Sequence, residues 1–165
     1  MTLQIRMGAL GLILLLAGCG FHLRGSGMDD VALTDMPMIY LQSGNPQSGM
    51  LEELQRRGKL QGANFTQESS AAELALNITS ENFDRRVLSV GTTGKVREYE
   101  LHYAVTYTVL DKEGVEKLAN RISLVRDYRF DETRVLGKEA EEKQLRQDMV
   151  RDAAQQIMRQ LRALK

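Results

Sequence analysis

Residues Glu98–Val109 read EYELHYAVTYTV, and this stretch decides the fold because its side chains alternate strictly in character. The odd-numbered positions carry only tyrosine, leucine and valine, whereas the even-numbered positions carry glutamate, histidine, alanine and threonine. A period of two over so many residues is typical of a β-strand with one buried face. We therefore predict a long strand whose odd-numbered side chains lie in the core of a sheet.

A second strand and a long helix are predicted downstream. Asp111–Gly114 supplies turn residues, and Arg121–Phe130 alternates again, which predicts a hairpin. Residues 138–164 then show helical spacing, with an apolar stripe that consists of Leu145, Met149, Ala153, Ile157, Leu161 and Leu164. Such a stripe predicts a helix that covers one face of the sheet.

Three shorter elements are predicted upstream. Residues 38–42 form an apolar run before a Ser-Gly-Asn-Pro turn, residues 47–57 have helical spacing, and residues 74–79 alternate. Gly58 is expected to cap the helix. The order β-α-β-β-β-α predicts an α+β fold, a two-layer sandwich with two helices packed on one face of a four-stranded, mostly antiparallel sheet.

The N-terminus has the pattern of an export signal. Met7–Leu16 is an unbroken run of apolar residues and glycine, long enough for a signal peptide and too short to span a bilayer. Small residues then precede Cys19, the only cysteine. We predict that residues 1–18 are removed, that Cys19 is acylated as a lipid anchor, and that residues 19–165 form a single domain. Because the next residue is glycine, and not the aspartate that retains bacterial lipoproteins in the inner membrane, we expect the outer membrane.

Composition and motifs exclude several functional classes. The chain carries 22 basic and 22 acidic side chains, so it lacks the basic excess of a typical nucleic-acid binder. His22 and His102 have no neighbour at metal-ligand spacing, and no nucleophile or phosphate-loop motif is present. We therefore expect no nucleic-acid partner, no cofactor, no metal and no catalytic activity.

Basic residues gather around two loops. The first group lies on both sides of the glycine-containing loop 91–94 and consists of Arg85, Arg86, Lys95 and Arg97. The second group lies in the connection to the last helix and consists of Arg134 and Lys138. If the second and fourth strands run in the same direction, both groups lie at one end of the sheet, where they would suit phosphate groups. A solvated surface remains the alternative. The polar sheet face around Glu100 is likewise either solvated or suited to the water-lined lumen of a membrane barrel.

The stretch Gly18–Arg24, GCGFHLR, resembles the start of the mature chain in the LPS-assembly lipoprotein family LptE, also called RlpB. Weaker similarities are Glu98-Tyr99, Gln147–Met149 and Ala153–Ile157. The resemblance implies a non-catalytic lipoprotein, anchored in the outer membrane through acylated Cys19. Its domain would lie on the periplasmic side and within the lumen of the LptD barrel, which it plugs and helps to assemble, and it would bind lipopolysaccharide on the way to the outer leaflet.

The resemblance also points to ligand residues. A basic residue at the start of the last helix in this family corresponds to Lys138. A second basic residue of the family lies before the central strand and corresponds to Thr92, which carries no charge. Lys95 or Arg97 would then supply the second positive charge. Two alternatives stay open. An envelope lipoprotein that binds peptidoglycan or another barrel-assembly factor would share the anchor, and a lipoprotein enzyme would need a pocket built from residues far apart in sequence.

Overall fold

The computed structural model describes residues 36–45, 47–130 and 135–164, and of residues 135–138 the backbone alone. The predicted signal peptide, Cys19, the GCGFHLR stretch and Arg134 lie outside these residues. Among the helices so described, none is long and apolar enough to cross a membrane.

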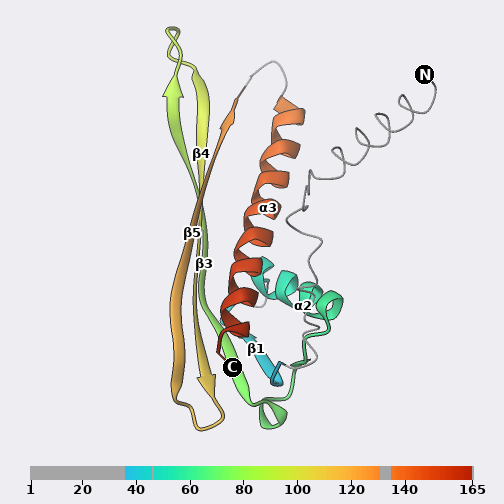
Figure 1. Ribbon diagram of the computed structural model, residues 1–165. Helices are drawn as coiled ribbons and strands as arrows, with labels where there is room; N and C mark the ends of the chain where they lie inside the picture. The colour runs from blue at the N-terminus through green and yellow to red at the C-terminus, as the bar shows by residue number, and fades with distance from the viewer. Residues whose placement is uncertain (1–35, 46, 131–134, 165) are drawn as a thin grey trace, which may run out of the picture. The chain divides into compact units, whose positions relative to one another are not determined.

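Three long strands make up most of the sheet (Figure 1): β3 (Leu74–Val90), β4 (Val96–Asp111) and β5 (Glu116–Arg129). β4 lies between the other two and is antiparallel to both. The predicted burial of the odd-numbered side chains of β4 is confirmed for Leu101, Tyr103, Val105, Tyr107 and Val109, whereas Tyr99 is half-buried. β3 continues well past the predicted residues 74–79, and β5 begins six residues before Ile122.

Two short strands complete the sheet and correct its predicted topology. β1 (Ile39–Ser43) pairs in parallel with β3, and β2 (Phe65–Thr66) pairs in parallel with β1. The strand order is β2-β1-β3-β4-β5, so the sheet is five-stranded and mixed, not four-stranded and mostly antiparallel. Two residues are too few to show an alternating pattern, which is why β2 escaped prediction.

Two helices pack on the sheet, as predicted (Figure 1). They are α2 (Gly49–Gln61) and α3 (Val135–Arg162), and a single turn of 3-10 helix, η2 (Ser69–Ala71), precedes β3. Their apolar stripes are buried against the odd-numbered side chains of β4. The buried apolar side chains of the two helices are Met50, Leu54, Met149, Ala153, Ala154, Ile157, Met158 and Leu161.

The C-terminal cap of α2 differs from the prediction. The helix ends at Gln61 and is capped by Gly62, whose φ of 71° is the left-handed conformation that glycine adopts readily. Gly58 lies inside the helix, where a Cβ would stand 2.1 Å from Cε2 of Phe65. Gly58 is therefore a packing residue that lets the Phe65 ring approach the helix backbone.

A register shift between Ile78 and Ser80 changes which side chains of β3 face the helices. Before the shift, the even-numbered residues of β3 lie in the core; after it, Glu81, Phe83 and Arg85 pair with odd-numbered residues of β4 and so share their face. This bulge places two charged side chains on the helix side of the sheet.

Glu81 uses its position to cap α2 from a different element. Its carboxylate accepts hydrogen bonds from the Met50 amide at 3.1 Å and from Ser48 Oγ at 2.5 Å. The Tyr103 hydroxyl donates to the same carboxylate at 2.9 Å. The start of α2 is thus tied to both β3 and β4.

Candidate functional site

The turn between β3 and β4 carries an exposed cation. In this turn the Gly91 amide donates to the Lys95 carbonyl at 2.7 Å, and Gly94 has a φ of 77°. The side chain of Arg97, near the start of β4, lies across Gly91, since a Cβ at Gly91 would stand 2.8 Å from Arg97 Nε. Glycine at position 91 therefore leaves room for the guanidinium to rest on the turn.

Arg97 is uncompensated as well as exposed. Within the ranges that the structure covers, no carboxylate pairs with its guanidinium. The carboxylate of Glu98, the next residue, has other partners. It accepts a hydrogen bond from Ser89 Oγ at 2.7 Å and lies 3.7 Å from Arg129 Nε. The Arg97 backbone is held by the Phe130 amide, which donates to its carbonyl at 2.7 Å. A fixed backbone with a free guanidinium suits the binding of an anion such as phosphate.

The start of α3 follows at the same end of the sheet. β3 and β5 run in the same direction, because both are antiparallel to β4, and β5 ends at Arg129, opposite Glu98. α3 begins at Val135, so Lys138 lies in its first turn. The predicted meeting of the two basic groups at one end agrees with this topology, although the side chain of Lys138 is not among those described. Its role in ligand binding stays a prediction.

The guanidinium of Arg85 forms an ion pair with a carboxylate of α3. Arg85 lies within β3, and its Nη1 donates to Glu142 Oε2 of α3 at 2.8 Å. Its guanidinium also stacks on the Tyr99 ring, 4.6 Å from the centroid. The hydrogen bond to Glu142 raises the pKa of Arg85. These contacts attach the beginning of α3 to the sheet, and a role for Arg85 in binding a ligand stays a prediction.

Glu142 is the centre of this attachment. Besides Arg85, it accepts hydrogen bonds from the Tyr128 hydroxyl at 2.5 Å and from Arg146 Nη2 at 2.8 Å. Burial opposes ionisation of Glu142, but the bonds from Tyr128, Arg85 and Arg146 outweigh it and lower the pKa of the carboxyl. Burial, with the bond to Glu142 adding to it, raises the pKa of Tyr128 to about 12, so the phenol keeps the proton that it donates.

Arg86 lies on a different surface from Arg85. It is next to Arg85 in β3, so its side chain projects to the opposite face, where its Nε donates to Asp84 Oδ2 at 2.7 Å. That hydrogen bond lowers the pKa of Asp84. On the same polar face, His102 contacts Glu100. No group of three or more potential metal ligands occurs among the residues that the structure describes.

A cleft of about 580 Å³ opens between α2 and α3. Its lining comes from three separated segments and consists of Gly49, Glu52, Glu53, Arg56, Phe83, Lys143, Arg146, Gln147, Val150 and Arg151. Sequence patterns did not reveal it, because no single segment carries enough of its residues to form a recognisable motif.

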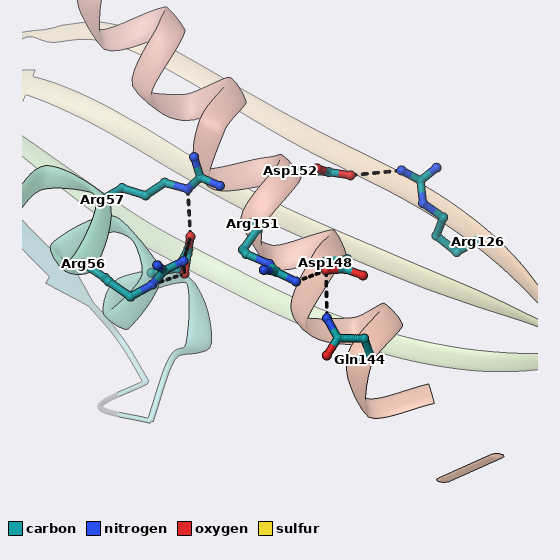
Figure 2. Close-up of polar contacts among 8 residues, drawn as sticks. Arg56, Arg57, Arg126, Gln144, Asp148, Arg151 and Asp152 are labelled. Carbon is teal, nitrogen blue, oxygen red and sulfur yellow. Dashed lines mark hydrogen bonds and ion pairs between the residues drawn. The ribbon is translucent and has the colours of Figure 1, made fainter. Parts of the chain in front are cut away.

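The arginines of this cleft are paired with carboxylates (Figure 2). On α2, Glu53 lies 2.7 Å from both Arg56 Nη2 and Arg57 Nε, and on α3 Arg151 contacts Asp148. Gln144 adds a further hydrogen bond to Asp148, and Arg126 of β5 pairs with Asp152 at 3.0 Å. The guanidinium groups here are compensated, whereas that of Arg97 is not.

Comparison with known proteins gives one consistent family. A family model described as LptE, Lipopolysaccharide-assembly, matches residues 37–161. The LPS-assembly lipoprotein LptE of Yersinia enterocolitica is 30% identical over 160 residues, which cover 96% of this chain and 75% of the relative. Its counterpart in Pectobacterium atrosepticum is 28% identical over 150 residues, with 90% and 79% covered.

Solved structures agree with the fold. The solution structure of an uncharacterized lipoprotein B from Nitrosomonas europaea superposes with a TM-score of 0.69 at 30% identity and covers 76% of this chain and 82% of that one. The crystal structure of rare lipoprotein B from Shewanella oneidensis superposes with a TM-score of 0.66 at 27% identity, with 76% and 94% covered.

Proposed function

Because the chain belongs to the LptE family of lipopolysaccharide-assembly lipoproteins, we propose that it plugs the LptD β-barrel of the outer membrane, helps that barrel to assemble, and binds lipopolysaccharide during its insertion into the outer leaflet. Family membership gives the chain a role in lipopolysaccharide assembly, and this family is not enzymatic. Beyond this role, we propose that the chain binds LptD, contacts lipopolysaccharide directly and is anchored in the membrane.

The observation that carries the ligand contact is the free guanidinium of Arg97. It is exposed, it rests on the turn after β3, and the described residues offer it no carboxylate. Lipopolysaccharide carries phosphate groups, and a guanidinium binds phosphate through two parallel hydrogen bonds. Lys138, in the first turn of α3, supplies the second cation of the proposed site.

The sheet face away from the helices supports the barrel partner. Several of its charges are paired, as Glu98 lies 3.7 Å from Arg129 Nε and Asp84 lies 2.7 Å from Arg86 Nε. The inside of an outer-membrane barrel is polar and wet. A sheet face with many polar side chains and paired charges fits such a lumen, because these side chains can stay hydrated there.

Acylation of Cys19 completes the proposal. One acyl chain holds a protein at a membrane only marginally, whereas two or three chains give stable attachment. A domain attached in this way stays beside the barrel while the barrel assembles.

Purification of the tagged lipoprotein from outer membranes in mild detergent tests the barrel partner. We expect LptD to copurify in near-equal amounts. Recovery of the lipoprotein alone, or with a peptidoglycan-binding or other barrel-assembly protein, would replace this proposal with the alternative of another envelope partner.

Titration of the purified lipoprotein with lipopolysaccharide tests the ligand contact. Arg97→Glu is expected to weaken binding about tenfold or more, because a repelling charge replaces an attracting one. Arg121→Glu is the matched control, since Arg121 is also an exposed strand arginine to which the described residues offer no carboxylate. Equal losses in the two variants would mean that the overall charge, and not this site, determines binding.

A further inference from the structure

Exposed apolar side chains are concentrated at the end of β3. In the described part of the chain, seven large apolar side chains are exposed, and three of them, Val87, Leu88 and Val90, fall within four consecutive positions. Their exposed fractions are 53%, 48% and 59%. The other four, Met38, Leu60, Val115 and Val125, are far from one another in sequence. We call Val87, Leu88 and Val90 the apolar tip.

The pairing of β3 with β4 explains why these side chains are not buried. The register shifts between Val87 and Ser89 and again between Ser89 and Val90, so the end of β3 is irregular. Val87 pairs with Tyr99 and therefore projects to the helix face. Leu88 has no partner in the β4 register, and Val90 pairs with Val96, an even-numbered residue of the polar face. The apolar tip thus exposes apolar side chains on both faces of the sheet.

A cation borders the apolar tip. Arg97 lies across Gly91, the residue that follows Val90, and carries no compensating carboxylate among the described residues. Exposed branched aliphatic side chains next to a free guanidinium are complementary to a molecule that joins acyl chains to a phosphate group.

A lipid fits this arrangement better than the surface of a folded protein. A flat protein surface would cover one face of the hairpin and leave the other in water, and the polar lumen of a barrel offers neither face an apolar partner. Acyl chains can surround the hairpin on both sides.

We propose that the apolar tip binds the acyl chains of lipopolysaccharide while Arg97 binds a phosphate group of the same molecule. This inference rests on the proposed function and adds to it the part of the ligand that this end of the sheet recognises. This end of the sheet would therefore bind the acyl chains of lipopolysaccharide as well as one of its phosphate groups.

Paired titrations of the full-length lipoprotein test this inference. The ligands are intact lipopolysaccharide, fully deacylated lipopolysaccharide, and vesicles of phosphatidylglycerol. The triple variant Val87→Ser, Leu88→Ser, Val90→Ser is expected to lose at least about tenfold in affinity for intact lipopolysaccharide and to bind the deacylated form as wild type does. Leu60→Ser, at another exposed leucine, is the matched control and is expected to change neither affinity.

A single photocrosslinking residue at position 88 gives a second measurement that does not depend on the stability of the triple variant. In whole cells, position 88 is expected to form an adduct with lipopolysaccharide, and position 60 is not. Wild-type affinity of the triple variant for intact lipopolysaccharide, an equal loss for the deacylated form, a loss confined to the vesicles, or crosslinking of position 88 to protein alone would each overturn the inference. Wild-type protein that binds no lipopolysaccharide would overturn the proposed function and this inference together.

Discussion

The hydroxyl of Tyr128, in β5, donates a hydrogen bond of 2.5 Å to the carboxylate of Glu142, in α3. Arg85 of β3 and Arg146 of α3 donate to the same carboxylate at 2.8 Å each. Glu142 therefore joins both outer long strands to the first turns of the helix. The position of the start of α3, and with it that of Lys138, depends on this contact.

Glu142→Gln is expected to destabilise the fold by about 1 to 2 kcal/mol at neutral pH, because charged hydrogen bonds are lost while Arg85 and Arg146 stay partly solvated. The pKa of Glu142 is lowered in the folded state, so the unfolded state binds its proton first as the pH falls. The stabilisation is complete above the ordinary glutamate pKa of about 4.3 and is lost as the pH falls through the lower folded value. Urea unfolding at pH 7 and near pH 3 should show the difference between wild type and variant shrinking in acid.

Asp152→Asn is the matched control for Glu142→Gln. Asp152 also accepts from an arginine of β5, at 3.0 Å, but both partners are about half exposed. We expect a loss below about 0.5 kcal/mol. A loss as large as that of Glu142→Gln would mean that general helix charge, and not the shared carboxylate, determines the effect.

Gly58→Ala is expected to destabilise the protein by about 1 to 3 kcal/mol through overpacking against Phe65. Alanine would ordinarily stabilise a helix interior by about 0.5 to 1 kcal/mol, so the sign of the change reports the ring contact. In a Phe65→Ala background the same substitution should become neutral or favourable. Thermal unfolding of the four proteins measures this, and an equal loss in both backgrounds would contradict it.

Tyr103→Ala is expected to cost about 3 to 5 kcal/mol, because the side chain is 1% exposed and its ring packs 4.4 Å from that of Phe83. Tyr103→Phe keeps the ring and loses only the bond to Glu81, so about 1 kcal/mol is expected. Urea unfolding separates the two contributions. If the phenylalanine variant lost as much as the alanine variant, the cap on α2 would outweigh the packing.

Lys138→Asp is expected to weaken lipopolysaccharide binding more than it weakens association with LptD, because a reversed charge acts mainly on an anionic ligand. The two quantities are measured by titration and by copurification from the same preparation. Equal losses would show that the ligand and barrel contacts are one surface.

Cys19→Ala is expected to release the domain from the membrane and leave it folded, since the predicted anchor precedes the elements of the fold. Membrane fractionation and a circular dichroism melt check the two halves of this expectation. A variant that is soluble but unfolded would mean that the domain limits, 19–165, are drawn wrongly.

Local patterns predicted the strands and helices that have one clear apolar face, and failed where the pattern is interrupted. The alternation of Glu98–Val109 is confirmed along β4, whereas the bulge after Ile78 breaks the alternation of β3 and hid its second half. Strand direction depends on long-range pairing, so the parallel position of β1 has no local signal. The predicted helix, residues 47–57, ends four residues before α2 does, because a glycine after an apolar stripe is typical of a helix cap and Gly58 is a packing residue instead.

The common location of the candidate residues was predictable only on the condition that two strands run in the same direction, and their contacts were not predictable. Arg97 and the first turn of α3 lie at one end of the sheet because β3 and β5 do run in the same direction. That Arg85 is bound by Glu142, 57 residues away, depends on packing that no local pattern encodes. Val87, Leu88 and Val90 form an apolar cluster in sequence, but only the register shifts show that they are exposed.

β5 is the last strand of the sheet, and in the part of the chain that the structure describes it pairs with β4 alone. Fourteen residues of strand with one unpaired edge are a template for self-association, which leads to aggregation when a second copy adds to that edge. Exposed cations recur along the strand at Lys117, Arg121, Arg126 and Arg129. A second copy of β5 would have to take these long charged side chains out of water, so the charged edge opposes such an addition.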